Sequence, residues 1–144
     1  MTKTEIVIIL KIIAIWLIMA VLAMVNGVLR DDFFAPILGA NVALPLSSIS
    51  LTIIVVLITY LSIPFFGKNT RSTFMAIGIA WMVIILFFEF VFGYYSVLRP
   101  WGVMLQVFNI PDGNLFLLVL LVSLLAPYVM ARFRGYILIP NKVI

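Results

Sequence analysis

The sequence predicts an all-α, polytopic integral membrane protein with four transmembrane helices. The first observation is composition: of 144 residues, 66% are apolar and 10% are charged, whereas soluble domains average roughly 45–50% and about 25%. A compact soluble fold of this size could not cover its surface with so few polar groups. The second observation is a series of four long apolar segments. We therefore expect one transmembrane domain over residues 1–144.

The four segments set the expected helix boundaries. They cover residues 6–29, 49–66, 74–95 and 115–133. Each is close to or above the ~20 residues that cross a bilayer as a helix. The first segment is not expected to be a cleaved signal peptide, because Lys11 interrupts its apolar region and Glu5 lies where a basic region would be.

Lys and Arg gather on one side of the predicted bundle. The two termini and the connection between the second and third segments share that side, with seven cations: Lys3, Lys11, Lys68, Arg71, Arg132, Arg134 and Lys142. The other two connections hold Arg30 and Arg99. Because cytoplasmic flanks are enriched in Lys and Arg, we expect a multi-pass protein of the bacterial inner membrane with both termini cytoplasmic. This topology accounts for the basic composition, so no nucleic-acid partner is expected.

The two outer connections, 33–48 and 97–113, are more apolar than ordinary loops. The first contains Pro36, Gly39 and Pro45, and the second begins near Pro100, a residue suited to the first turn of a helix. A short helix after Pro100 would place four apolar side chains near one face: Trp101, Met104, Leu105 and Phe108. We expect both connections to lie partly at the outer membrane interface, with re-entry into the bilayer as the alternative.

The residue inventory argues against enzymatic chemistry. The chain has no Cys and no His, which removes thiolate and imidazole ligands and the commonest general base. One acid lies within an apolar segment, so no pair of carboxylates and no nucleophile–base pair is evident. We expect a non-enzymatic protein with no cofactor and no bound metal.

Glu89 is that intramembrane acid, and its helical neighbours offer no partner. A carboxylate there must take a proton or meet a cation from another helix. Arg30 and Arg99 lie at the same outer level, and Arg30 follows a face of small residues, Ala20, Ala23 and Gly27, that is typical of a close helix contact. We predict that Glu89 pairs with an arginine, Arg30 first, either to fix packing or to serve a functional site.

Hydroxyl groups form a stripe along the second segment. Ser48, Thr52, Thr59 and Ser62 fall within about 80° of arc at 100° per residue. Hydroxyls in such a stripe bond to their own helix or to a neighbouring helix; the alternative is one wall of a polar path. Farther along the chain, Pro64 and Pro127 are expected to leave the carbonyls of Tyr60 and Ser123 without a helical donor.

Two further patterns suggest an internal repeat and a resemblance to other proteins. Val-Leu-Arg occurs at 28–30 and again at 97–99, which would fit a hairpin repeat of 1–68 and 69–144. The motifs Asn-Gly-Val-Leu-Arg at 26–30, Pro-Ile-Leu-Gly at 36–39, Leu-Ser at 46–47 and Phe-Glu-Phe-Val-Phe-Gly at 88–93 resemble short four-helix bacterial inner-membrane proteins of unassigned function. This resemblance implies a fold and a compartment only.

Two functions fit these features. The first is a non-enzymatic membrane protein that acts by packing with itself as a homo-oligomer, with a membrane-protein partner or with lipid. The alternative is a transporter or channel for a small solute or a lipophile, including a proton-coupled one, that uses Glu89, Arg30 and the stripe from Ser48 to Ser62. A cavity that connects Glu89 to Thr59 would distinguish the alternative from the first.

Overall fold

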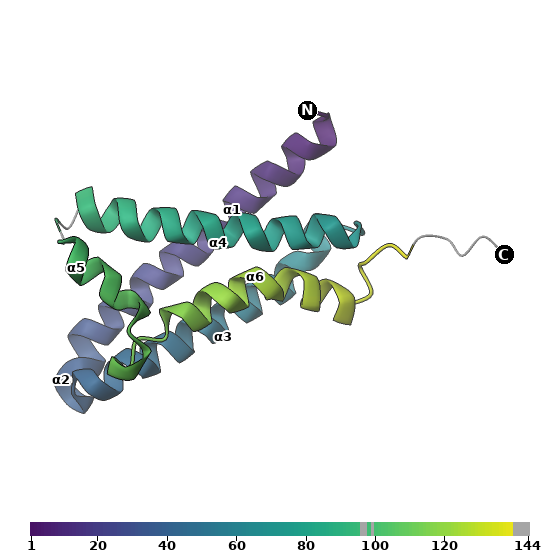
Figure 1. Ribbon diagram of the computed structural model, residues 1–144. Helices are drawn as coiled ribbons and strands as arrows, with labels where there is room; N and C mark the ends of the chain where they lie inside the picture. The colour runs from purple at the N-terminus through teal and green to yellow at the C-terminus, as the bar shows by residue number, and fades with distance from the viewer. Residues whose placement is uncertain (96–97, 99, 140–144) are drawn as a thin grey trace.

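The computed structural model describes residues 1–95, 98 and 100–139, and its regular elements in that part of the chain are helices (Figure 1). The four long helices are α1 (Lys3–Leu29), α3 (Ala40–Phe66), α4 (Arg71–Tyr95) and α6 (Phe116–Phe133). Short helical turns connect them: η1 (Arg30–Phe34), α2 (Ala35–Leu38), α5 (Trp101–Met104), η2 (Leu105–Phe108) and η3 (Ile110–Asp112). In that part of the chain, four helices are long and apolar enough to cross a membrane, which confirms the predicted all-α class and the predicted number of candidate spans.

The structure corrects the expected outer connection at 33–48. Helix α1 continues through η1 and α2, so that the first candidate span is Lys3–Leu38, and α3 already begins at Ala40. The break between them is Gly39, whose φ of 82° is accessible to glycine at little cost. Pro36 lies in the first turn of α2 and Pro45 lies inside α3. Proline is tolerated in membrane helices when other groups satisfy the freed backbone, so neither residue marks a loop.

A cluster of fully or almost fully buried apolar side chains lies at the end of the bundle where α3 finishes and α4 begins. Phe74, Ile77 and Trp81 of α4 are buried there against Ile63 and Phe66 of α3. The indole Nε1 of Trp81 donates a hydrogen bond to the carbonyl oxygen of Ile12 in α1, at 3.1 Å. We call this region the inner end.

Helices α4 and α6 approach each other at Gly78. A Cβ atom on this residue would lie 2.0 Å from the carbonyl oxygen of Leu124. Only glycine permits this backbone separation, in keeping with the small residues found at membrane helix crossings.

Two cations bind the exposed carbonyls at the end of α3. The guanidinium of Arg134 donates to the Tyr60 carbonyl and the ammonium of Lys11 donates to the Phe65 carbonyl, both at 2.7 Å. Pro64 has no N–H to donate to the Tyr60 carbonyl, and the sequence predicts that this carbonyl lacks a helical donor. In the structure the guanidinium of Arg134 takes the place of that donor. After Arg134, the chain pairs with the α3–α4 connection through a bridge between Asn69 and Ile137.

The opposite, outer end is more open. Figure 1 shows the Tyr95 end of α4 lying apart from the α1–α3 hairpin, with α5 and the turns after it between them. Helix α5 begins directly after Pro100, which confirms the predicted short helix. Trp101 and Phe108 each stack on Phe90 of α4 with ring centroids 6.2 Å apart, and Met104 is buried.

Candidate functional site

A cavity of about 610 Å³ occupies the outer half of the bundle between α1, α3, α4 and η2. Pockets that hold small molecules measure roughly 300–1,000 Å³. Met19, Val55 and Val119 belong both to the lining and to the buried core. The core therefore closes the cavity toward the inner end.

One wall is aromatic. Trp16 of α1 meets Phe88 of α4 edge to face at 5.5 Å, and Phe88 stacks on Phe92 at 5.2 Å. All three residues line the cavity. These are preferred ring geometries, so the wall is an ordered surface of three rings.

Small residues of α1 give the cavity its width. Ala20, Ala23 and Gly27 line it, and a Cβ atom on Gly27 would meet nothing within 4 Å. The sequence predicted that this face makes a close helix contact. The structure shows that it faces a cavity instead, because α1 meets α3 along a neighbouring face through Asn26.

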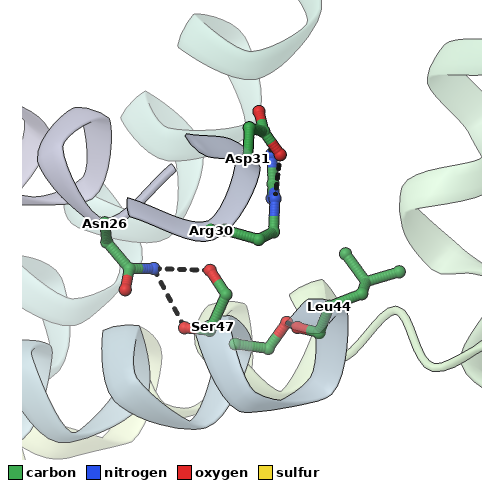
Figure 2. Close-up of polar contacts among 6 residues, drawn as sticks. Asn26, Arg30, Asp31, Leu44 and Ser47 are labelled. Carbon is green, nitrogen blue, oxygen red and sulfur yellow. Dashed lines mark hydrogen bonds and ion pairs between the residues drawn. The ribbon is translucent and has the colours of Figure 1, made fainter. Parts of the chain in front are cut away.

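Asn26 and Ser47 connect α1 to α3 beside the cavity (Figure 2). The Asn26 amide nitrogen donates to the Ser47 carbonyl at 2.9 Å and to the Ser47 hydroxyl oxygen at 2.8 Å. Both residues line the cavity, and Asn26 is only 7% exposed. Both residues belong to the motifs quoted for the family resemblance, but the sequence analysis did not predict a contact between them. The signal was present, since Asn26 is the one carboxamide within the predicted first span.

Three charged side chains among the described residues line the cavity: Arg30, Asp31 and Glu89. Arg30 binds its neighbour Asp31 in a bidentate pair, with Nε–Oδ1 at 2.8 Å and Nη2–Oδ2 at 3.2 Å (Figure 2). The sequence predicted Glu89 as the partner of Arg30, whereas the structure gives Arg30 a pair with Asp31. Arg30 and Glu89 do face the same cavity. Arg99 lies outside the described residues, and an arginine partner for Glu89 stays a prediction.

The hydroxyl stripe bonds within its own helix. Each hydroxyl donates to a carbonyl three or four residues earlier: Ser48 to Leu44 (3.1 Å), Thr52 to Ser48 (2.8 Å), Thr59 to Val55 (2.7 Å) and Ser62 to Thr59 (3.0 Å). Of the four, Ser48 lines the cavity, which extends along α3 as far as Val55. Thr59 is 0% exposed. In the described part of the chain, the cavity that holds Glu89 therefore ends before Thr59.

The cavity thus combines an aromatic wall with a polar edge at the outer end, which can hold a molecule with an apolar body and a polar head. No protein-family model, no curated protein and no solved structure matches this chain.

Proposed function

We propose that this protein is a non-enzymatic membrane protein that binds one amphipathic molecule in the cavity of its outer half. The observation that carries the proposal is the cavity itself. Its volume of about 610 Å³ suits one small ligand, and its lining offers both aromatic and polar side chains.

The extent of the cavity favours binding over a continuous polar path. A channel through the stripe would require the cavity to pass Val55 and reach Thr59, which is fully buried and bonded to its own helix. A protein that acts only by packing with itself, a partner or lipid has no need of such a cavity. The apolar side chains exposed along all four spans contact lipid in either case.

The proposal includes an orientation. By the predicted excess of Lys and Arg at the termini, the cavity faces the periplasmic side of a bacterial inner membrane. Alkaline phosphatase fused after residue 144 should be inactive, whereas the same enzyme inserted at Gly39, between α2 and α3, should be active. Activity of the terminal fusion would reverse the orientation and place the cavity toward the cytoplasm.

A blocking substitution tests the binding function. Gly27→Leu places a side chain in open space within the cavity, and Gly102→Leu places the same side chain in equally open space on α5, outside the lining. Native mass spectrometry with 2-(1-naphthyl)ethylammonium, its N,N,N-trimethyl analogue, 2-(1-naphthyl)ethanol and 1-naphthylacetate should show a 1:1 complex with at least one compound. Gly27→Leu should abolish that complex and Gly102→Leu should retain it. Equal binding by both variants would refute the proposal.

A further inference from the structure

We propose that the ligand is a lipophilic alcohol, an apolar body with an uncharged hydroxyl head that Asn26 and Ser47 bind together. This inference rests on the proposed function and specifies the ligand class of the same cavity. It follows from the juxtaposition of a hydrogen-bond acceptor and a hydrogen-bond donor, on two buried side chains of the lining, that the fold leaves unused.

The acceptor is the amide oxygen of Asn26. A backbone carbonyl can only accept, so the bond to the Ser47 carbonyl fixes the amide with its nitrogen toward α3. Figure 2 shows both dashed bonds leaving from this nitrogen, with the oxygen on the other arm of the amide. The oxygen accepts no hydrogen bond from the described residues, and none of their fully buried polar side-chain atoms lacks a partner. The oxygen is therefore accessible, and Asn26 lines the cavity.

The donor is the hydroxyl group of Ser47. Its oxygen accepts from the Asn26 amide at 2.8 Å, which leaves its own hydrogen to donate. The neighbouring Ser48 hydroxyl donates to the Leu44 carbonyl, whereas the Ser47 hydroxyl donates to no acceptor in the described part of the chain. Ser47 is buried and lines the cavity. Because a hydrogen bond joins the Ser47 hydroxyl to the Asn26 amide, one head group can reach both.

Two other carboxamides of the lining do not offer this combination. The Asn114 amide is used at both ends, since it donates to the Gln106 carbonyl at 3.2 Å and accepts from the Phe116 N–H at 3.3 Å. The Gln106 side chain is exposed, so its amide is hydrated without a ligand. Buried polar groups are normally hydrogen-bonded, so the unused capacity of the Asn26–Ser47 pair indicates a binding site.

The pair matches the two hydrogen bonds of an alcohol. A hydroxyl group can donate to the Asn26 oxygen and accept from the Ser47 hydroxyl. An ammonium has donors and no acceptor, whereas a carboxylate or an ether has acceptors and no donor. An uncharged head also loses less solvation than an ion when it leaves water. The hydroxyl is therefore the head group that uses both members of the pair.

The apolar body has room beside this pair. Ala23 and Gly27 line the cavity next to Asn26 and extend no side chain beyond Cβ. Trp16 lies closer to the inner end on the same helix, and its ring meets Phe88 of α4 at 5.5 Å. Both rings line the cavity. An alcohol with its head at Asn26 therefore places its body against small and aromatic side chains.

Three compounds with one naphthyl body separate the two hydrogen bonds. 2-(1-Naphthyl)ethanol donates and accepts, its methyl ether only accepts, and 1-ethylnaphthalene does neither. Dissociation constants are measured by equilibrium dialysis against protein in nanodiscs of zwitterionic lipid. Empty nanodiscs give the ligand concentration in the lipid, to which the constants are referred, so that differences in partitioning cancel.

Wild type should bind the alcohol about fivefold or more tighter than the ether, and the ether about twofold or more tighter than 1-ethylnaphthalene. 2-(1-Naphthyl)ethylammonium and 1-naphthylacetate, measured in the same way, should both bind more weakly than the alcohol.

Three variants assign these preferences to residues. Asn26→Leu should bring the alcohol and ether constants within about twofold of each other, because the acceptor is lost. Ser47→Ala keeps the backbone carbonyl that holds the Asn26 amide. It should retain the preference for alcohol over ether and lose the preference for ether over 1-ethylnaphthalene, a test that does not depend on the folding of Asn26→Leu. The matched control Gln106→Leu removes an exposed carboxamide from the same lining and should change both preferences less than about twofold.

The outcomes separate the two proposals. Tighter binding of the ammonium or of naphthylacetate than of the alcohol, or equal binding of alcohol and ether by wild type, would overturn the alcohol class and leave the binding function intact. An unchanged preference for ether over 1-ethylnaphthalene in Ser47→Ala, or equal losses in Gln106→Leu and Asn26→Leu, would also overturn it. Absence of saturable binding of every compound to wild type would overturn both proposals.

Discussion

Gly78→Ala tests whether the crossing of α4 and α6 sets the stability of the bundle. The added Cβ would lie 2.0 Å from the Leu124 carbonyl oxygen, whereas an ordinary carbon–oxygen contact is about 3.3 Å. The two helices must therefore separate by roughly 1.3 Å at this point. The obstructing atom belongs to backbone, so no side-chain rotation relieves the contact.

The cost follows from overpacking a close interface. Such insertions cost about 1–3 kcal/mol, and a backbone obstruction places this one toward the upper end. Alanine recovers up to about 1 kcal/mol of helix propensity, which leaves a net loss near 2 kcal/mol. At roughly 2–4 °C per kcal/mol for a chain of this length, Tm should fall by about 4–8 °C.

Gly27→Ala provides the matched control for the assay. It makes the same change within α1, where the new Cβ meets nothing within 4 Å. Thermal unfolding of the purified protein in detergent, followed by circular dichroism, should give an unchanged or higher Tm for Gly27→Ala. Equal Tm values for the two variants would refute the argument that the α4–α6 approach requires glycine.

Three further predictions concern polar contacts. Arg134→Gln should lower Tm in wild type and lower it less in Pro64→Ala, whose restored N–H can serve the carbonyl that Arg134 binds; additive losses would contradict this replacement. Arg30→Gln and Asp31→Asn should couple by less than about 1 kcal/mol because the pair is partly exposed. A separate double-mutant cycle with Arg30→Gln and Glu89→Gln tests the predicted Arg30–Glu89 pair. Strictly additive losses of stability would exclude that pair.

The sequence predicted the helices well where hydropathy alone decides them. The expected spans 74–95 and 115–133 differ by at most three residues from α4 and α6, because segment length and apolarity are the properties that a bilayer selects. The start of α3 was wrong because Pro45 resembles a helix breaker in sequence. In the structure, Pro45 lies within a continuous helix and the break is at Gly39.

The sequence also predicted the level of the site. A rise of 1.5 Å per residue fixes depth within each span, so Arg30 and Glu89 were expected near each other, and both line one cavity. The cavity itself was not predictable. It depends on the angle between α1 and α4, and that angle follows from side-chain packing that hydropathy does not encode.

The contacts that define this angle lie mostly outside the cavity. At the inner end, the Trp81–Ile12 hydrogen bond connects α1 to α4, and Gly78 permits the close approach of α4 to α6. At the outer end, Asn26 draws α1 to α3 while Trp101 and Phe108 occupy the side of α4 at Phe90. The helices are thus joined at one end and held apart at the other. A substitution that separates α4 from α6 should consequently alter the cavity at a distance.

We therefore expect Gly78→Ala to affect ligand binding as well as stability. If the inner crossing positions α4, and with it Phe88 and Glu89, this variant should weaken binding of the naphthyl compound that wild type binds, at a temperature where the variant is fully folded. Neither Gly78 nor Leu124 lines the cavity, so direct contact with the ligand is excluded as a cause. Wild-type affinity in a folded Gly78→Ala protein would show instead that the outer contacts alone fix the shape of the cavity.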